Sequence, residues 1–323
     1  MGHKTLIIKT GYSEVLIEGD HSQNVSLGDV LRTTAILHLF KNDEVTWVTD
    51  EKAFPLLENN PFIKRLLPYN LTTALQLQSE EFDTLINLEK TPGICALADK
   101  ISAWRRYGFR FNKRTGTAEA YEKSFEVLSI SSDFDLRKNI TKSFQELLFE
   151  MIGFKWNNEP YIFGYKPKSQ EVYDIGLNTN VGKKWPTKIW PKEYWDELES
   201  KLIQAGLKVT RQDKQDSKIL TDLNAYADWI NSCKLIVSPD TLGLHLSIAL
   251  NKKIVGLFGP TSNKEVYLYW LGEILLPIPL PECISCFNSV CKKEKICMLD
   301  ISPQRVYEKV TQIFKNTGGN TSL

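Results

Sequence analysis

The sequence of 323 residues has almost no net charge, no long hydrophobic run and few cysteines. Lys and Arg number 40 against 39 Asp and Glu, for a formal charge of +1, while 42% of the residues are hydrophobic. A disordered chain needs less hydrophobicity and more net charge, and a protein that mainly wraps nucleic acid usually carries a basic excess. The composition therefore predicts a globular protein of about two domains that does not act on nucleic acid.

Long apolar segments are missing as well. The only apolar run before Lys9 covers residues 6–8, which is too short for the core of a secretory signal. No stretch approaches the roughly 18 uninterrupted apolar residues of a membrane-spanning helix. We expect a cytoplasmic protein, with the inner face of the membrane as an alternative location if its substrate is membrane-borne.

Cysteine is rare except in one short stretch. Four of the six cysteines are Cys283, Cys286, Cys291 and Cys297. Their spacing is short enough to surround one tetrahedral ion, and in a reducing compartment such a cluster favours a metal site or free thiols over disulfides. A structural zinc or iron ion, reduced thiols and disulfides remain alternatives. Cys95 and Cys233 stand alone among apolar residues and are expected in the core.

Apolar runs alternate with amphipathic stretches, which is typical of strands and helices in turn. In the first half, strands are expected at 4–8, 44–48, 63–67 and 84–88, and helices at 27–40, 52–58 and 74–79. Residues 91–152 are expected to be mainly helical. In the second half, strands are expected at 174–177, 207–210, 234–237 and 253–257, and helices at 192–204, 223–232, 244–250 and 303–314.

This pattern predicts an α/β protein with two doubly wound parallel sheets in series. The first domain is expected at 1–156, and the polar segment 157–173, with its prolines and glycine, is expected to be a linker. The second domain is expected at 174–323 and includes the cysteine-rich loop and a terminal helix. The long segment 11–25, after the first strand, is interpreted either as a flap over a cleft or as a surface insertion.

Three loops at strand ends could bind an anion. The sequence Ser-Leu-Gly-Asp at 26–29 opens a helix, where Asp29 either favours the helix dipole or acts as a general base. Asn178, Gly182 and Lys188 lie in a polar loop before a helix, which could present N–H donors and a cation to a phosphate. The two Trp-Pro pairs of that loop could instead simply lock a packed segment.

The third loop joins a buried strand to a helix. Asp240 or Thr241 is expected to cap that helix, with Gly243 in its first turn and His245 one turn further in. A histidine on an apolar helix is usually a satisfied core group, but the turn at 259–261 ends the next strand at the same edge of the sheet. This convergence favours a binding site.

Together these residues resemble glycosyltransferase family 9, the ADP-heptose:lipopolysaccharide heptosyltransferases and their relatives. The resemblance rests on Ser-Leu-Gly-Asp at 26–29, Lys-Ile-Trp-Pro at 188–191, Asp240-Thr241 with His245, and Phe-Gly-Pro-Thr at 258–261, and it runs from Lys4 to about Val310. The sequence departs from the family pattern at Leu242, where glycine is frequent, and at 211–218, where a glycine-rich strand end is frequent.

The resemblance implies a GT-B fold, in which two Rossmann-like domains face each other across a cleft, and an inverting transfer without a catalytic metal. Asp29 matches the catalytic base, and Lys188 matches the lysine that neutralises the leaving diphosphate. The implied donor-binding residues are Asn178, Gly182, Lys188, Asp240, Thr241, Gly243 and His245. The implied donor is a nucleotide diphosphate sugar, with ADP-heptose favoured.

The resemblance also implies an acceptor hydroxyl on a bacterial surface glycan such as lipopolysaccharide core. Arg32, Arg105 and Arg106 are the candidate acceptor contacts, because guanidinium groups suit phosphates and acidic sugars. The default interpretation of the basic run 100–114 is a solvated face. Alternatives for the whole chain are a degenerate nucleotide-sugar-binding protein, a heptosyltransferase acting on a protein or small molecule, and a metal-dependent assembly module. The oligomeric state stays open.

Overall fold

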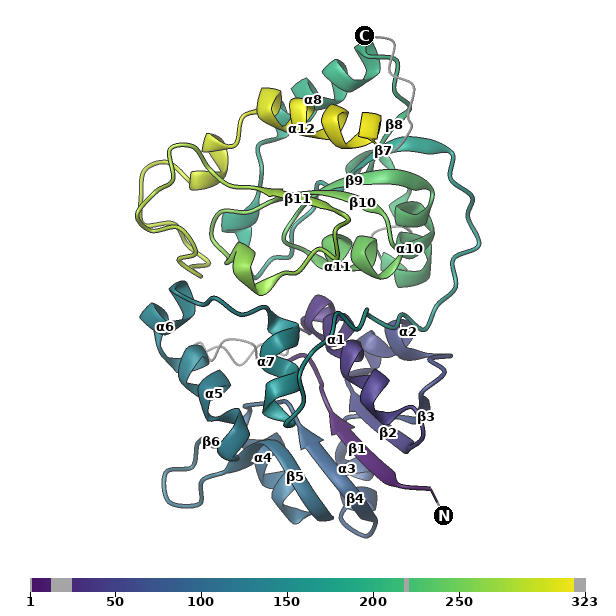
Figure 1. The fold of residues 1–323 in the computed structure, drawn as a ribbon, viewed down its shortest axis with the longest axis vertical. Helices are drawn as coiled ribbons and strands as arrows, with labels where there is room; N and C mark the ends of the chain where they lie inside the picture. Colours follow the sequence, from purple (N-terminus) through teal and green to yellow (C-terminus); the bar gives the residue numbers. More distant parts are fainter. Residues whose placement is uncertain (1, 13–24, 218–220, 317–323) are drawn as a thin grey trace. The chain divides into compact units, whose positions relative to one another are not determined.

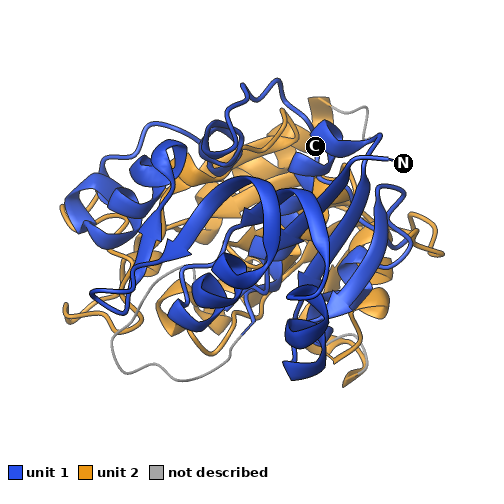
Figure 2. Ribbon diagram, turned by 90° about the horizontal axis from the view of Figure 1, so that it is seen from below, with its two compact units in different colours: residues 1–165 blue, residues 166–323 orange. Residues whose placement is uncertain are grey.

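The computed structural model describes residues 2–12, 25–217 and 221–316. The chain forms two compact units, residues 1–165 and 166–323, which Figure 2 distinguishes by colour. Most of the segment 11–25, interpreted above as a flap or an insertion, lies outside the described residues. Each unit has its own sheet and its own core.

The first unit contains a six-stranded sheet in the order β3-β2-β1-β4-β5-β6 (Figure 1). Its strands are β1 (Lys4–Ile8), β2 (Glu44–Thr49), β3 (Ile63–Pro68), β4 (Glu81–Asn87), β5 (Ser102–Phe111) and β6 (Ala118–Ala120). The first five are parallel, and β6 pairs antiparallel with β5. The central β1 is buried along Thr5–Ile8, which explains why its sequence is a continuous apolar run.

Helices surround this sheet. They are α1 (Leu27–Thr33), α2 (Phe54–Leu57), α3 (Leu71–Leu77), α4 (Pro92–Lys100), α5 (Phe125–Ser132), α6 (Phe134–Lys138) and α7 (Phe144–Met151). Short 3₁₀ helices cover Thr34–Phe40, Glu51–Ala53 and Glu122–Ser124. The single helix expected at 27–40 is therefore an α-helix that tightens into a 3₁₀ helix from Thr34 onward.

The mainly helical prediction for 91–152 was wrong over its middle part. Residues 102–111 form β5, the longest strand of the sheet, which pairs with β4 along one edge and with β6 along the other. The arginines of this strand made it look like a solvated helix, but β5 is exposed at several positions near the end of the sheet. A partly exposed strand tolerates Arg where a central parallel strand does not.

The second unit contains a five-stranded parallel sheet in the order β11-β10-β9-β7-β8. Its strands are β7 (Tyr173–Leu177), β8 (Val209–Arg211), β9 (Cys233–Pro239), β10 (Lys253–Leu257) and β11 (Gly272–Leu275). Its helices are α8 (Lys192–Gln204), α10 (Leu223–Asn231), α11 (Leu242–Ala249) and α12 (Pro303–Asn316). Short 3₁₀ helices cover Pro186–Lys188, Gln212–Lys214, Asn263–Glu265 and Cys297–Asp300.

Helices α8 and α12 lie side by side over one face of this sheet, and α10 and α11 lie on the other (Figure 1). The terminal helix α12 turns Val306, Val310 and Phe314 into the core, since residues four apart share one helix face. Cys95 and Cys233 are fully buried in their respective units, as predicted.

The segment 157–172 contains no helix or strand. Its first part is hydrogen-bonded to the first unit, where the N–H of Ile162 donates to Thr34 Oγ1 at 2.9 Å. Its last part is bonded to the second unit, where the N–H of Lys168 donates to Asp228 Oδ1 at 2.6 Å. The boundary between the units, after Tyr165, falls inside this segment.

Candidate functional site

The candidate site of the second unit lies where the parallel strands end. Strand β7 leads into the loop that starts at Asn178, β9 leads into Asp240 and Thr241, and β10 leads into the turn at 258–261. Because β7, β9 and β10 are parallel neighbours, these three loops leave the same edge of the sheet. Ligands of open α/β sheets bind at such an edge.

Lys188 and Asp240 form an ion pair at this edge. The Nζ of Lys188 donates to Asp240 Oδ2 at 2.7 Å and to the Asp240 carbonyl at 3.0 Å, and it lies over the ring of Trp185. Only 12% and 15% of the two side chains are exposed. Lys188 ends the 3₁₀ helix Pro186–Lys188, which begins at the proline of the first Trp-Pro pair. The loop therefore places a nearly buried cation directly beside the start of α11.

The carboxylate of Asp240 stays charged despite its burial. Burial alone would raise its pKa, but Lys188 and His245 outweigh that effect and hold the pKa of Asp240 below its usual range. The Nε2 of His245 lies 3.9 Å from Asp240 Oδ1. His245 is 5% exposed and sits one turn inside α11, as the spacing predicted.

Asn178 belongs to a buried polar network. Its amide nitrogen donates to Ser238 Oγ at 2.8 Å and to Thr241 Oγ1 at 2.9 Å, and its amide oxygen accepts from the hydroxyl of Tyr226 at 2.6 Å. Gly243 packs against the same network, because a Cβ there would lie 2.3 Å from the Tyr226 hydroxyl. Asn178 and Gly243 thus support the site from inside the fold.

The side-chain cap expected on α11 is not formed. Thr241 occupies the N-cap position, but its side chain makes no cap hydrogen bond to the helix. The Thr241 hydroxyl instead lies 2.9 Å from the amide nitrogen of Asn178 and 3.3 Å from Ser238 Oγ. The start of α11 is left without a side-chain cap beside the ammonium of Lys188. Gly182 stands apart from this cluster in an exposed part of the loop, with no atom within 4 Å of where a Cβ would be.

In the first unit, Asp29 and Arg32 form a close pair on α1. Arg32 donates its Nη2 to Asp29 Oδ1 at 2.6 Å, and both side chains are largely buried. The guanidinium of Arg32 also stacks on the ring of Phe144, with 3.7 Å between its carbon and the ring centre. Asp29 lies in the first turn of α1, the first helix after β1.

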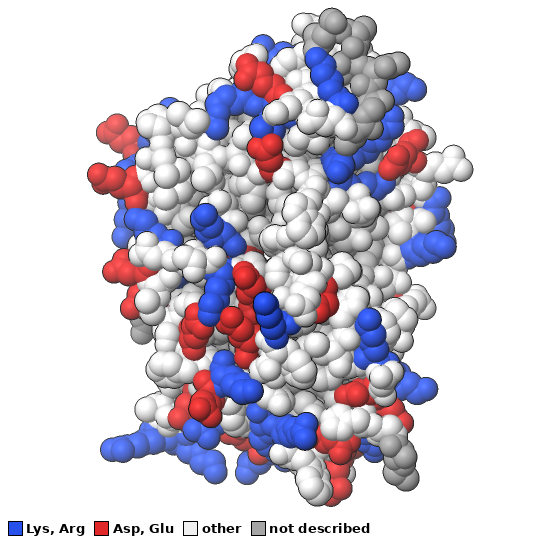
Figure 3. All heavy atoms as spheres, viewed as in Figure 1, with Lys and Arg blue, Asp and Glu red and all other residues white. Residues whose placement is uncertain are grey.

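The other two acceptor candidates differ in their surroundings. Arg105 is exposed on β5. Arg106 donates from Nη1 to the carbonyl of Ala98 at 2.7 Å and from Nη2 to the carbonyl of Ile101. It therefore provides hydrogen-bond donors for two carbonyl groups at the end of α4. On the face drawn in Figure 3, basic and acidic side chains of the described residues intermingle.

The four clustered cysteines line one cavity of about 260 Å³. All four are half-buried free thiols, and burial, together with the three neighbouring thiols, raises the pKa of Cys297 to about 11. Within the described ranges, no three Cys, His, Asp or Glu side chains converge closely enough to hold a metal ion.

The cysteine segment also touches the candidate site. The N–H of Ser285 donates to the carbonyl of Gly259 at 3.1 Å, and Thr187 Oγ1 donates to the carbonyl of Asn288 at 2.7 Å. Thr187 is the neighbour of Lys188 in the same 3₁₀ helix. The segment therefore braces both the turn after β10 and the helix that carries the lysine.

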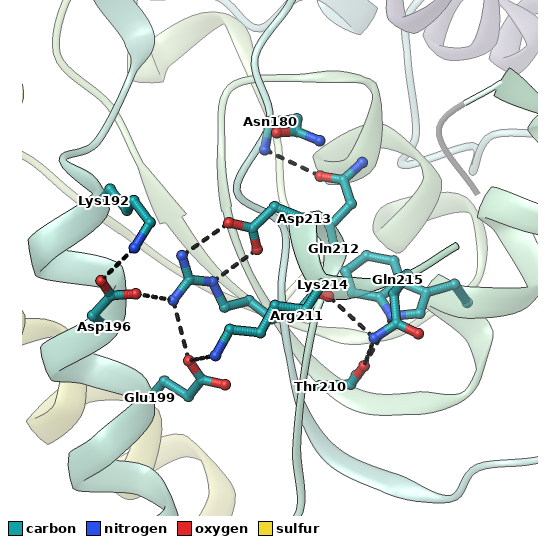
Figure 4. A network of polar contacts seen from close by, with 11 residues as sticks. Asn180, Lys192, Asp196, Glu199, Thr210, Arg211, Gln212, Asp213, Lys214 and Gln215 are labelled. Atoms are coloured by element: carbon teal, nitrogen blue, oxygen red, sulfur yellow. Dashed lines mark hydrogen bonds and ion pairs between the residues drawn. The ribbon is translucent and has the colours of Figure 1, made fainter. Parts of the chain in front are cut away.

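No local sequence pattern indicates the ionic cluster at the end of β8, which is drawn in Figure 4. Arg211 is 1% exposed, and its guanidinium donates to carboxylates of Asp213, Asp196 and Glu199. Burial alone would lower the pKa of Arg211, but the three carboxylates raise it above its usual range. The next residue, Gln212, turns the other way and accepts from the N–H of Asn180 at 3.1 Å. The pairing of Arg211 with α8 joins residues far apart in sequence, which no local pattern encodes.

Comparison with known proteins finds similarity to heptosyltransferases. A model of the family described as glycosyltransferase family 9 (heptosyltransferase) matches residues 218–296. Lipopolysaccharide heptosyltransferase 2 of Escherichia coli K12 is 24% identical over 243 residues, covering 66% of this chain and 68% of that protein. Lipopolysaccharide heptosyltransferase 1 of Pseudomonas aeruginosa is 24% identical over 351 residues, covering 87% and 93%.

The solved structure of the E. coli ADP-heptose lipopolysaccharide heptosyltransferase II superposes with a TM-score of 0.65. It shares 16% identity, with 98% of this chain and 100% of that chain covered. Together with the two parallel-sheet units, this likeness confirms the predicted GT-B fold. In the described part of the chain, no helix is long and apolar enough to cross a bilayer.

Proposed function

The chain is a heptosyltransferase-like member of glycosyltransferase family 9, and from this premise we propose that it transfers a heptose or a related sugar from a nucleotide diphosphate donor. The acceptor that we propose is a hydroxyl of a bacterial surface glycan such as lipopolysaccharide core. Activity as a glycosyltransferase follows from the family, whereas the donor, the acceptor and the residue roles are our proposals. ADP-heptose is the proposed donor, since it is named for the structurally similar E. coli enzyme.

One observation carries the donor assignment in particular. Lys188, largely buried and paired with Asp240 at 2.7 Å, lies beside the start of α11, which has no side-chain cap. A helix start presents N–H groups and the positive end of the helix dipole, and Lys188 adds an ammonium group that is balanced by Asp240 and that a phosphate oxygen would have to share with this carboxylate. This arrangement suits a diphosphate, whose negative charge grows as the sugar leaves.

The proposed reaction needs a base, an electrophile and a leaving group. Asp29 takes the proton from the acceptor hydroxyl, and the oxygen attacks the anomeric carbon from the face opposite the diphosphate. The bond between that carbon and the diphosphate oxygen breaks, and its electron pair stays on the nucleotide. Lys188 and the start of α11 lower the barrier to the extent that they bind the departing diphosphate more tightly than the intact donor.

Arg32, Arg105 and Arg106 are the proposed contacts to acidic groups of the acceptor. Arg105 is exposed and has the simplest route to such a role. Arg32 is paired with Asp29, so its contribution would include fixing the orientation of the base. Arg106 would have to serve the acceptor while it holds the two carbonyls at the end of α4.

Substitution of Asp29 by Asn tests the assignment of the base. A matched control is Asp135→Asn, because Asp135 lies in the first turn of α6, as Asp29 lies in the first turn of α1. Loss of a positioned base costs about 10²- to 10⁴-fold in rate. We expect such a loss in kcat for Asp29→Asn only, with both variants folded. Equal kcat values for Asp29→Asn and the parent protein would contradict the role and leave the helix-dipole interpretation.

We also propose that the cysteine cavity holds a structural zinc or iron ion, with no step in sugar transfer. The donor set supports this, because four thiols from one short segment line a single cavity and thiolates are preferred ligands of both metals. The thiols would have to move closer together to bind one ion, because no three of them converge on a common point in the described structure, and the charge of the ion would favour their thiolate form. Elemental analysis of purified protein and of a Cys286→Ser variant tests it. Metal-free protein, even after incubation with Zn²⁺ or Fe²⁺, would contradict the proposal.

A further inference from the structure

The hydroxyl of Thr241 could cap α11, but it lies within hydrogen-bond distance of Asn178 and Ser238 instead. As the N-cap residue of α11, Thr241 is of the type that normally accepts a hydrogen bond from the N–H groups of the first turn. Instead its Oγ1 lies 2.9 Å from the amide nitrogen of Asn178, and no cap bond is made. The helix start is therefore kept uncapped by a specific contact inside the protein.

Asn178 is itself fully engaged and cannot reach a ligand without giving up a partner. Its side chain has no exposed surface. Both amide hydrogens are used, one on Ser238 and one on Thr241, and the amide oxygen accepts from the hydroxyl of Tyr226. An asparagine amide has two donors, and here both are occupied. Asn178 therefore acts through Thr241 rather than by contact with a bound molecule.

Tyr226 fixes the orientation of this amide. Its hydroxyl donates to Asn178 Oδ1 at 2.6 Å, while the Ser238 hydroxyl donates to the carbonyl of Pro239 at 2.7 Å and leaves Ser238 Oγ to accept from the amide nitrogen, which sets that nitrogen toward Ser238 and Thr241. Tyr226 is 8% exposed and stacks on Trp229, with 6.1 Å between ring centres. The network is packed too tightly at Gly243 to admit even a Cβ. The amide thus has one stable arrangement.

We infer that Asn178 and Tyr226 are positioning residues that hold the Thr241 hydroxyl away from α11, so that the first-turn N–H groups remain available to the donor diphosphate. This inference rests on the proposed function, which supplies the diphosphate and places it beside Lys188. A threonine free to cap the helix would compete with the diphosphate for the same N–H groups. A side-chain cap changes an equilibrium constant by roughly fivefold, so competition from the Thr241 hydroxyl should weaken diphosphate binding by about that factor.

The test compares nucleotide binding by Asn178→Ala and by the double variant Asn178→Ala/Thr241→Ala. Calorimetry with ADP, UDP, GDP and dTDP first identifies the diphosphate that the parent protein binds best, and the matching nucleoside serves as the second probe. We expect Asn178→Ala to bind the diphosphate about fivefold more weakly or worse, with nucleoside affinity within twofold of the parent. The double variant, which has no hydroxyl to compete, should recover at least half of the loss on a logarithmic scale.

Two results would overturn the inference alone. One is a parallel loss of diphosphate and nucleoside affinity, which a merely structural role of Asn178 predicts. The other is a double variant that binds no more tightly than Asn178→Ala. If the parent protein binds no nucleoside diphosphate, dTDP included, the proposed function fails and the inference fails with it.

A second pair of variants covers the case in which Asn178→Ala does not fold. Tyr226→Phe keeps the ring and removes only the hydroxyl that orients the amide. We expect a smaller loss of diphosphate affinity, again with the nucleoside affinity unchanged, and recovery in Tyr226→Phe/Thr241→Ala. Unchanged diphosphate binding by folded Tyr226→Phe would remove Tyr226 from the assignment.

Discussion

Replacing Gly243 by Ala adds one carbon to the most crowded position of the candidate site. The new Cβ would lie 2.3 Å from the hydroxyl of Tyr226 and 2.4 Å from the amide nitrogen of Asn178. Neither atom belongs to a flexible chain end, because both side chains are buried and hydrogen-bonded to each other. The substitution must therefore displace the network or shift α11.

The expected cost follows from two opposed effects. Overpacking a filled interior costs about 1–3 kcal/mol, and loss of a buried hydrogen bond adds about 1 kcal/mol. Replacing glycine by alanine within a helix stabilises the folded state by up to about 1 kcal/mol. The free energy of unfolding of the second unit should fall by about 1–3 kcal/mol. For a unit of this size, each kcal/mol lowers the thermal midpoint by about 2–4 °C.

Two other glycines provide matched controls. Gly182 lies in the exposed part of the loop after β7 and Gly93 lies in the first turn of α4, and neither has an atom within 4 Å of where a Cβ would be. Scanning calorimetry should show Gly182→Ala within about 0.5 kcal/mol of the parent and Gly93→Ala equal or slightly more stable. A Gly243→Ala midpoint that matches that of Gly182→Ala would refute the packing argument.

Three further predictions concern charged groups. Lys188 outweighs burial and holds the pKa of Asp240 below its usual range, so the stabilisation by the pair is present near neutral pH and is lost as the pH falls through that lowered value. Urea unfolding from pH 7 to pH 2 should therefore show that Asp240→Asn has a lower free energy of unfolding than the parent, by an amount that shrinks in acid. A difference that stays constant with pH would contradict this. Arg211→Met leaves three carboxylates without their shared partner and should destabilise the second unit by about 2–3 kcal/mol in urea titrations, a figure reduced because two of the carboxylates are partly exposed. Arg106→Ala should lower the thermal midpoint, whereas Arg105→Ala should leave it unchanged and raise only the acceptor KM; equal midpoints would argue against the structural role of Arg106.

Much of the fold could be predicted from the sequence because buried parallel strands are apolar along their whole length. The strands 4–8 and 253–257 and the helix 192–204 were predicted with the bounds that the structure has. The prediction failed at β5, where arginines and a glycine interrupt the apolar pattern. The segment is a strand because it pairs with β4 and β6, which lie elsewhere in the sequence.

The candidate site was predictable in its composition but not in its contacts. Residue types at the ends of β7 and β9 pointed to Lys188, Asp240 and His245, which the structure brings together. The expected cap on α11 was wrong, because Thr241 binds Asn178, which is 63 residues away along the chain. Local spacing predicts which groups are near a helix start, whereas long-range partners decide what those groups do there.

Turnover of nucleotide sugars tests the central claim most directly. Purified protein is incubated with ADP-heptose, and in parallel with UDP-, GDP- and dTDP-sugars, together with a deacylated lipopolysaccharide core acceptor, and released nucleotide and glycosylated product are measured. We predict acceptor-dependent release of ADP from ADP-heptose, with product of inverted anomeric configuration and loss of turnover in Asp29→Asn. Turnover of another nucleotide sugar would contradict the proposed donor alone. Binding of a donor without transfer to any acceptor offered, and without slow hydrolysis, would contradict the proposed transfer and favour a nucleotide-sugar-binding protein.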